Sequence, residues 1–388
     1  MIGPMRVSAE WRWAVPKLLA LFLVARLIVV LAAVSVEWLA TPSSAGPGGS
    51  LLRATERPVL ASLTSWDGVY YLGIARDGYQ VGPVNGPYPE TVFFPLYPAL
   101  TAAAAAPLGG DLPLGGVLVA NVCGLLGLLG AYALARRRLS RDAALLAAAF
   151  VALGPGSVAF SMAYSDSLFL ALAVGAFLAA DRGGSQARGG STTRGGVGWR
   201  AVAGVLALLA GMTRLQGALL FVPLLWLFVQ QDQGRPRSSW LAALGAPVGL
   251  AAYCLWIGNL TGDPLGPILA QGAWDFGAVP GAVAEPWVVA VAALIYGSTA
   301  VLALKLLWDR WRARIDAPGV SWGAVNLAAL VVARRVASLP RYLAPVTQIA
   351  EQLVGGNYRP RTVRLILAAS VAAYSVLAVL HFALKLAP

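Results

Sequence analysis

Residues 16–38 read PKLLALFLVARLIVVLAAVSVEW, and Lys17, Arg26 and Glu37 are the only charged side chains among them. An α-helix needs about 20 mostly apolar residues to cross the hydrocarbon core of a bilayer, so this stretch predicts a membrane-spanning helix. The stretch is too long for the apolar core of a cleavable signal peptide. We therefore interpret it as an uncleaved signal anchor, with cleavage near residues 40–45 as the alternative.

Apolar stretches of similar character follow along the rest of the chain. Together with the first stretch they predict an all-α polytopic membrane protein of about eleven transmembrane helices, in a single domain over residues 1–388. The stretches after the first cover residues 113–135, 142–156, 163–180, 200–212, 217–230, 240–259, 286–306, 319–333, 340–355 and 363–384.

The composition supports a membrane protein. Of the 388 residues, 58% are hydrophobic and only 12% are charged, whereas soluble proteins carry about 25% charged residues. The arginines are spread between the apolar stretches and not gathered on one polar surface, which argues against nucleic-acid binding. His381 is the only histidine, so histidine metal clusters and Ser-His-Asp chemistry are excluded and no metal or other cofactor is predicted.

The distribution of basic residues predicts the orientation in the membrane. The net charge is +12, and basic residues collect near the N terminus and in the connections at 136–141, 182–200, 235–237, 305–314 and 359–364. Short basic connections stay on the cytoplasmic side of a membrane. We therefore expect a multi-pass cell-membrane protein with a cytoplasmic N terminus, and the remaining connections on the extracytoplasmic side.

Two long connections differ in composition. Residues 183–198 read GGSQARGGSTTRGGVG, which is typical of a flexible linker, so residues 181–199 are predicted to be a cytoplasmic linker. Residues 39–112 form the first extracytoplasmic loop and contain acidic, aromatic and proline residues, which is unusual for a simple connector. Within that loop, residues 94–108 are expected to form an interfacial or re-entrant helix.

Polar side chains interrupt apolar sequence at several points on the predicted extracytoplasmic side. Charged groups at membrane depth are costly and therefore usually functional, which indicates one shared cavity. Carboxylates, arginines and aromatic rings together suit a sugar bound next to a phosphate, because arginine binds phosphate oxygens in pairs and aromatic faces pack on sugar rings. When a sugar is carried on a lipid phosphate, the lipid phosphate is the leaving group and is already a stable anion, so one base and one cation are sufficient for transfer.

The same stretches resemble a known family. WDGVYYLGIARDGY at 66–79 followed by ETVFFPLYP at 90–98 resembles the PIG-V type of GPI mannosyltransferase II, an integral membrane glycosyltransferase of the GT-C class. Later blocks are similar to that family in the same order: AYSDSLF at 163–169, TRLQG at 213–217, GDPL at 262–265 with QGAW at 271–274, and SLPRY at 338–342. The alanine- and arginine-rich composition favours a bacterial member, which leaves the acceptor open.

The resemblance implies a GT-C architecture and an inverting transfer of mannose from a polyprenyl-phosphate-mannose donor to a hydroxyl acceptor, a glycolipid, glycan or protein, outside the cytoplasm. It implies that Asp67 is the catalytic base. We expect Arg214 and Arg341 to bind the donor phosphate. The residues expected to bind substrate are Trp66, Tyr71, Glu90, Tyr164, Asp166, Gln216, Gln271, Trp274 and Tyr342.

Structural explanations exist for several of these residues. Asp67 and Asp166 each precede a helical pattern and are suited to helix capping, and Glu90 has the character of a solvated loop carboxylate. Two other functions also fit a sugar-phosphate cavity. One is a GT-C enzyme that uses another lipid-phosphate sugar, and the other is a transporter or flippase for a lipid-linked sugar, although we find no internal repeat of the kind typical of transporters.

Overall fold

The computed structural model describes residues 4–39, 57–80, 90–188, 194–232, 238–273, 286–314, 317–332 and 339–383. All regular structure within these ranges is helical, which confirms the predicted fold class. The elements are α1 (Pro4–Leu39), α3 (Pro58–Leu63), α4 (Asp67–Asp77), η1 (Glu90–Val92), α5 (Leu96–Ala105), η2 (Ala106–Leu108), α6 (Leu112–Ala135), α7 (Arg141–Leu153), η3 (Pro155–Ser161), α8 (Asp166–Arg188), α9 (Arg194–Gly211), α10 (Leu215–Ala218), α11 (Phe221–Gln231), η4 (Ser238–Leu244), α12 (Gly245–Thr261), α13 (Gly266–Leu269), η5 (Ala270–Ala273), α14 (Pro286–Arg312), α15 (Ala317–Val332), α16 (Leu339–Leu343), α17 (Thr347–Gly355) and α18 (Pro360–Phe382).

Each apolar stretch predicted from the sequence coincides with one helix or with consecutive helices. Among the described residues, six helices are long and apolar enough to cross a membrane, and a seventh crossing is possible if α7 and η3, which meet at a bend of 73°, act as one span. The predicted stretch 340–355 is divided between α16 and α17. Several of the predicted helices are therefore too short to cross a bilayer by themselves.

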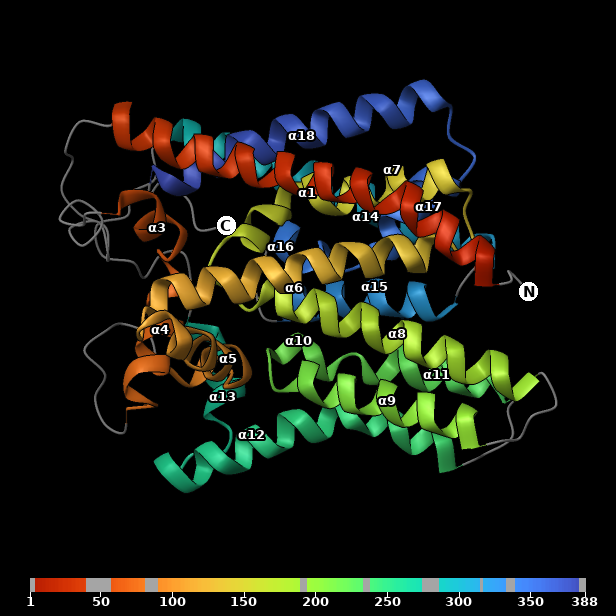
Figure 1. Ribbon diagram of the computed structural model, residues 1–388, viewed down its shortest axis with the longest axis horizontal. Coiled ribbons are helices and arrows are strands. Elements are labelled where there is room, and N and C mark those ends of the chain that lie inside the picture. Colours follow the sequence, from red (N-terminus) through yellow and green to blue (C-terminus); the bar gives the residue numbers. More distant parts are fainter. Residues whose placement is uncertain are drawn as a thin grey trace.

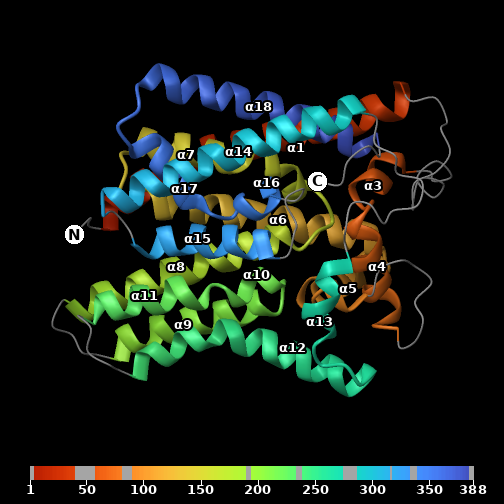
Figure 2. The same cartoon turned by 180° about the vertical axis from the view of Figure 1, so that it is seen from behind.

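The long helices lie roughly side by side, and several of the short helices gather at one end (Figure 1). We call this end, which carries α3, α4, α5 and α13, the site end. At the opposite end, α1, α7 and α18 all begin, as Figure 2 also shows. The arginines between α6 and α7 lie there, so we call it the basic end.

Residues 181–199 are not simply a flexible linker. Helix α8 continues to Arg188 and α9 begins at Arg194, while residues 189–193 lie outside the described ranges. The two helices pack against each other along their lengths, and the Arg182 guanidinium lies 4.9 Å from the centre of the Trp199 ring. Tertiary packing of this kind overrides the weak helix propensity of glycine and serine. The predicted helix within residues 94–108 is present as α5 and η2.

Small residues and a partly buried cation connect helices of the bundle. A methyl group added at Gly245 would lie 2.1 Å from the carbonyl oxygen of Gly204, so the close approach of α9 and α12 requires glycine at position 245. Arg26 lies inside α1 and donates hydrogen bonds of 2.8 Å each to the Asn121 side chain and the Phe160 carbonyl oxygen. These bonds connect α1 to α6 and η3, and satisfy a cation at membrane depth.

Candidate active site

Asp67 opens α4 at the site end. The residue before it, Trp66, has a φ of 55°, a conformation that costs about 1–3 kcal/mol in a residue with a side chain and is typical of functional sites. Trp66 occupies the cap position of α4, and no side chain caps the helix. Helix capping is therefore not the role of the Asp67 carboxylate, which instead lies 2.7 Å from Nη1 of Arg341 and is 17% exposed.

Asp166 joins both predicted arginines. Its carboxylate is fully buried and accepts hydrogen bonds from Arg341 at Nε (2.9 Å) and Nη2 (2.7 Å), a two-point contact. Arg214 also donates to the same carboxylate. The three residues come from the start of α8, from the residue before α10 and from α16, so the network unites segments far apart in the sequence.

The network formed by Asp67, Asp166, Arg214 and Arg341 is electrically balanced. It contains two carboxylates and two guanidinium groups, and Arg341 contacts both carboxylates. Isolated charges are expensive to bury, whereas paired and hydrogen-bonded charges are tolerated. Because Asp166 is enclosed and Asp67 is partly exposed, Asp67 is the carboxylate of the two that an entering substrate can reach.

Aromatic rings enclose the charged network. The Arg341 guanidinium lies 4.8 Å from the centre of the Tyr164 ring, and that of Arg214 lies 5.2 Å from the centre of the Tyr342 ring. Both distances are within the range of attraction between a cation and an aromatic face. The Tyr164 hydroxyl donates to the carbonyl oxygen of Ser65, 3.1 Å away, which ties the segment before α8 to the turn that carries Asp67.

Tyr71 and Gln216 adjoin the network. The Tyr71 hydroxyl lies 2.7 Å from the hydroxyl of Ser165, and burial raises the pKa of Tyr71 above its usual value, so its phenol stays protonated at neutral pH. The Gln216 amide donates to the side chain of Asn326 and to the carbonyl oxygen of Tyr342 (3.0 Å). It thereby connects α10 to α15 and α16, on which Arg341 depends for its position.

Two other predicted substrate residues lie in a neighbouring group. Glu90 accepts a hydrogen bond of 3.0 Å from the backbone of Gln80, and the Gln271 amide donates to the carbonyl oxygens of Val92 (3.3 Å) and Pro267 (3.1 Å). These hydrogen bonds are to segments other than those that carry the charged network. Trp274 lies outside the described ranges.

Three contributors were not predicted from the sequence. Ser165 binds Tyr71, Asn326 binds Gln216, and Tyr253 donates to the carbonyl oxygens of Thr91 and Phe93. Asn326 is fully buried within an apolar helix, and an amide in such a stretch is a signal that sequence reasoning can use. Ser165 and Tyr253 give no comparable signal, because hydroxyls are common in helices of this kind.

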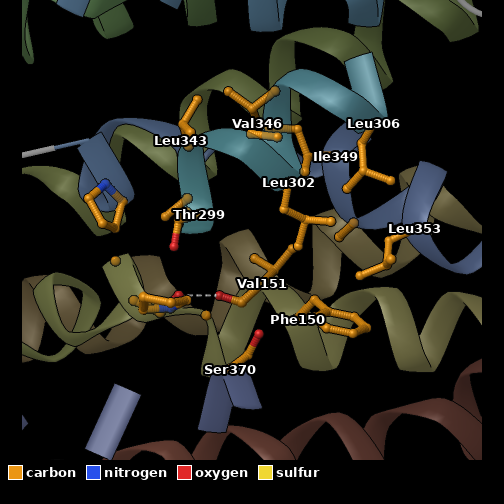
Figure 3. A pocket seen from close by; sticks show the side chains of 18 residues that line it. Phe150, Val151, Thr299, Leu302, Leu306, Leu343, Val346, Ile349, Leu353 and Ser370 are labelled. Atoms are coloured by element: carbon orange, nitrogen blue, oxygen red, sulfur yellow. Dashed lines mark hydrogen bonds between the residues drawn. The ribbon is translucent and has the colours of Figure 1, made fainter. Parts of the chain in front are cut away.

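An apolar cavity of about 120 Å³ lies beside Pro340, the chain neighbour of Arg341, and Figure 3 shows the side chains that line it. Val151 of α7, Leu302 of α14 and Leu353 of α17 line it, together with Pro340. The volume equals that of only about four water molecules. In this conformation the cavity therefore accommodates a short apolar segment of a ligand and not a long chain.

Gly156 in η3 sets the position of α16. A methyl group added there would lie 2.1 Å from the carbonyl oxygen of Pro340 and 2.5 Å from the backbone nitrogen of Arg341. We expect Gly156→Ala to displace Arg341, to destabilise the protein by about 1–3 kcal/mol and to reduce its activity. Thermal unfolding in detergent and a transfer assay check this. Gly73→Ala in α4 is the matched control, because a methyl group there meets no atom within 4 Å; equal effects of the two substitutions would contradict the positioning role.

The fold is similar to that of known membrane glycosyltransferases. One similar structure is the oligosaccharyltransferase from Archaeoglobus fulgidus with zinc and sulfate, which shares 16% identity with this chain at a TM-score of 0.50. Another is the same enzyme tethered to an acceptor peptide with the NVT sequon, which shares 17% identity at a TM-score of 0.52. A third, of oligosaccharyltransferase AglB from the same organism with an inhibitory peptide and a dolichol-phosphate, shares 16% with a TM-score of 0.51. The matches cover 94%, 96% and 94% of this chain but only 53%, 56% and 56% of those chains. This chain therefore spans about half the length of these neighbours. The likeness defines a GT-C-type fold.

A family model described as mannosyltransferase (PIG-V) matches residues 12–219. The chain therefore belongs to the PIG-V mannosyltransferase family and is a multi-pass membrane protein. Comparison with curated protein sequences gives no match. The matched range includes Asp67, Asp166 and Arg214, and the remaining charged member of the network, Arg341, comes from beyond it.

Proposed function

We propose that the protein transfers mannose from a polyprenyl-phosphate-mannose donor to a hydroxyl acceptor, with inversion at the anomeric carbon. The observation that carries this proposal is the contact of Asp67 with Arg341 at the edge of a buried charge network. A partly exposed carboxylate beside two guanidinium groups supplies the two functions that the reaction needs, a base and a phosphate-binding cation.

In the proposed step, the acceptor hydroxyl gives its proton to the Asp67 carboxylate. The acceptor oxygen forms a bond to the anomeric carbon while the bond from that carbon to the phosphate oxygen breaks. The electron pair leaves with the phosphate of the lipid carrier, so no proton has to be supplied to the leaving group. The developing charge on the phosphate is stabilised by Arg341 and Arg214.

Arg341 has a particular role in this scheme because it already contacts Asp67. When a donor phosphate enters, it competes with Asp67 for the guanidinium, and the carboxylate is released to accept a proton. The apolar cavity next to Pro340 is suited to the first carbons of the lipid carrier. The scheme relies on charged groups of the chain and requires no metal ion or other cofactor.

We further propose that the site end faces the extracytoplasmic side and the N terminus lies in the cytoplasm. The basic connections at the opposite end support this orientation. A lipid-linked donor is also consistent with the neighbouring oligosaccharyltransferase, whose structure is described as a complex with dolichol-phosphate and a peptide. The acceptor class remains a hydroxyl of a glycolipid, glycan or protein.

Purified protein reconstituted in liposomes tests the proposal. We expect labelled mannose to pass from polyprenyl-phosphate-mannose to an acceptor in a panel of glycolipids and hydroxyl-containing peptides, and the product to have the opposite anomeric configuration to the donor by NMR. The same rate with and without a chelator is expected. Transfer of glucose or arabinose, but not of mannose, from the corresponding polyprenyl-phosphate sugar would overturn the donor assignment. Movement of the lipid carrier between leaflets without any sugar transfer would support a flippase.

A further inference from the structure

A second cavity, unrelated to the charged network, opens at the basic end between α1, α7 and α18. It has a volume of about 570 Å³, within the range of about 300–1,000 Å³ found for small-molecule sites. Lys17 of α1, Asp142 of α7 and Arg364 of α18 are its charged lining residues, and the other lining residues are apolar. We call this cavity the basic-end groove.

The groove has a polar and an apolar end. All three helices begin at the basic end (Figure 1). Asp142 and Arg364 lie near the start of α7 and α18, and Lys17 lies in the first half of α1. Val24 and Ala149, which also line the groove, lie about 10 Å further along α1 and α7, given a rise of 1.5 Å per residue. The groove therefore changes from charged to apolar with depth, as a phospholipid does from headgroup to acyl chain.

The cations at the groove are not used for internal ion pairs. Among the described residues, neither Lys17 nor Arg364 has a carboxylate within 4.0 Å. The Lys17 ammonium lies 4.2 Å from the centre of the Trp13 ring, and the Arg141 guanidinium lies 4.1 Å from the same ring, so a third cation lies close by. Asp142 is in the first turn of α7, where the helix dipole favours an acidic residue. The surroundings carry a net positive charge even with Asp142 included.

We infer that the basic-end groove binds an anionic diacyl phospholipid, with the lipid phosphate between Lys17 and Arg364 and one acyl chain along Val24 and Ala149. Basic pockets between transmembrane helices are known to bind such headgroups. This site lies at the opposite end of the bundle from Asp67 and takes part in no step of the proposed transfer.

Native mass spectrometry of the full chain in detergent, titrated with phosphatidylglycerol, tests the inference. We expect one saturable phosphatidylglycerol adduct and an affinity that falls roughly 30-fold in the double variant Lys17→Gln, Arg364→Gln, because each cation near the membrane surface contributes on the order of 1 kcal/mol. Arg312→Gln is the matched control, since Arg312 is exposed at the end of α14 and does not line the groove. The control should bind as the unmodified protein does.

A third variant separates the lipid from free phosphate. Ala20 lines the groove and is exposed, so Ala20→Trp fills the groove without a clash in the core and keeps both cations. We expect it to lose the phosphatidylglycerol adduct. Equal binding of phosphatidylcholine, unchanged binding in the double variant, or competition by inorganic phosphate at similar concentration would each overturn the inference. None of these readouts depends on mannose transfer, so they are separate from the test of the proposed function.

Discussion

Asp67→Asn is expected to lower the rate of sugar transfer by at least about 100-fold, because general-base catalysis typically contributes a factor of about 10²–10⁴. The amide has nearly the same shape as the carboxylate but does not accept a proton from the acceptor hydroxyl. Arg341 keeps its two-point contact with Asp166, so the folded state should survive. Initial rates at saturating donor, with unfolding measured in the same detergent, check both parts.

The matched control for this substitution lies on the same helix. Asp77 is the last residue of α4 and forms an exposed ion pair with Arg76 at 2.8 Å. Exposed pairs contribute roughly 0–1 kcal/mol, so Asp77→Asn should leave both transfer and stability nearly unchanged. An Asp67→Asn enzyme with more than a tenth of the original rate would remove Asp67 from the role of base, and the reaction would then need a different proton acceptor.

The charged members of the network could be selected from the sequence because burying a charge at membrane depth costs free energy. Asp166, Arg214 and Arg341 interrupt apolar stretches, and charges in such places must find partners. Their gathering around Asp67 is therefore the predicted result. The helices were predictable for a related reason, since long apolar runs can satisfy their backbone in a membrane only as helices.

The pairing within the site was not predictable. From the sequence, Arg214 and Arg341 are expected to bind a donor phosphate, and in the structure both bind Asp166. This pairing depends on the approach of α16 to η3 at Gly156, a contact between segments far apart in the chain. Sequence reasoning groups Glu90 and Gln271 with the same cavity because they share its predicted side of the membrane. The structure pairs Glu90 with the backbone of Gln80, and Gln271 with carbonyl oxygens of η1 and α13. Side of the membrane alone does not define proximity.

Asp166 is expected to be the most important residue of the network for stability. Asp166→Asn leaves the Arg214 and Arg341 guanidinium groups with Asp67 as the remaining carboxylate of the network. Removing one partner of a buried ion pair typically costs about 3–5 kcal/mol, since an uncompensated charge stays buried. We expect a clear decrease in the unfolding midpoint in detergent, larger than that of Asp67→Asn, whose carboxylate is partly exposed.

A second substitution distinguishes lost charge balance from lost packing. In the double variant Asp166→Asn, Arg214→Gln, one carboxylate and one guanidinium remain, Asp67 and Arg341, so the network is balanced again. The double variant should therefore be more stable than Asp166→Asn alone, a coupling that a double-mutant cycle measures. If the double variant is instead destabilised by the sum of the two single effects, charge balance is not what Asp166 contributes. Its hydrogen bonds and packing would then explain its burial.

The buried pair of Arg200 and Asp232, 2.8 Å apart between α9 and the end of α11, serves as the control for stability. Asp232→Asn should also destabilise the fold, because both side chains are almost completely buried. It should leave the KM for the donor unchanged in the protein that remains folded. Asp166→Asn should change that KM as well, since its two arginines are the groups proposed to bind the donor phosphate. A change in stability alone for both variants would assign Asp166 a purely structural role.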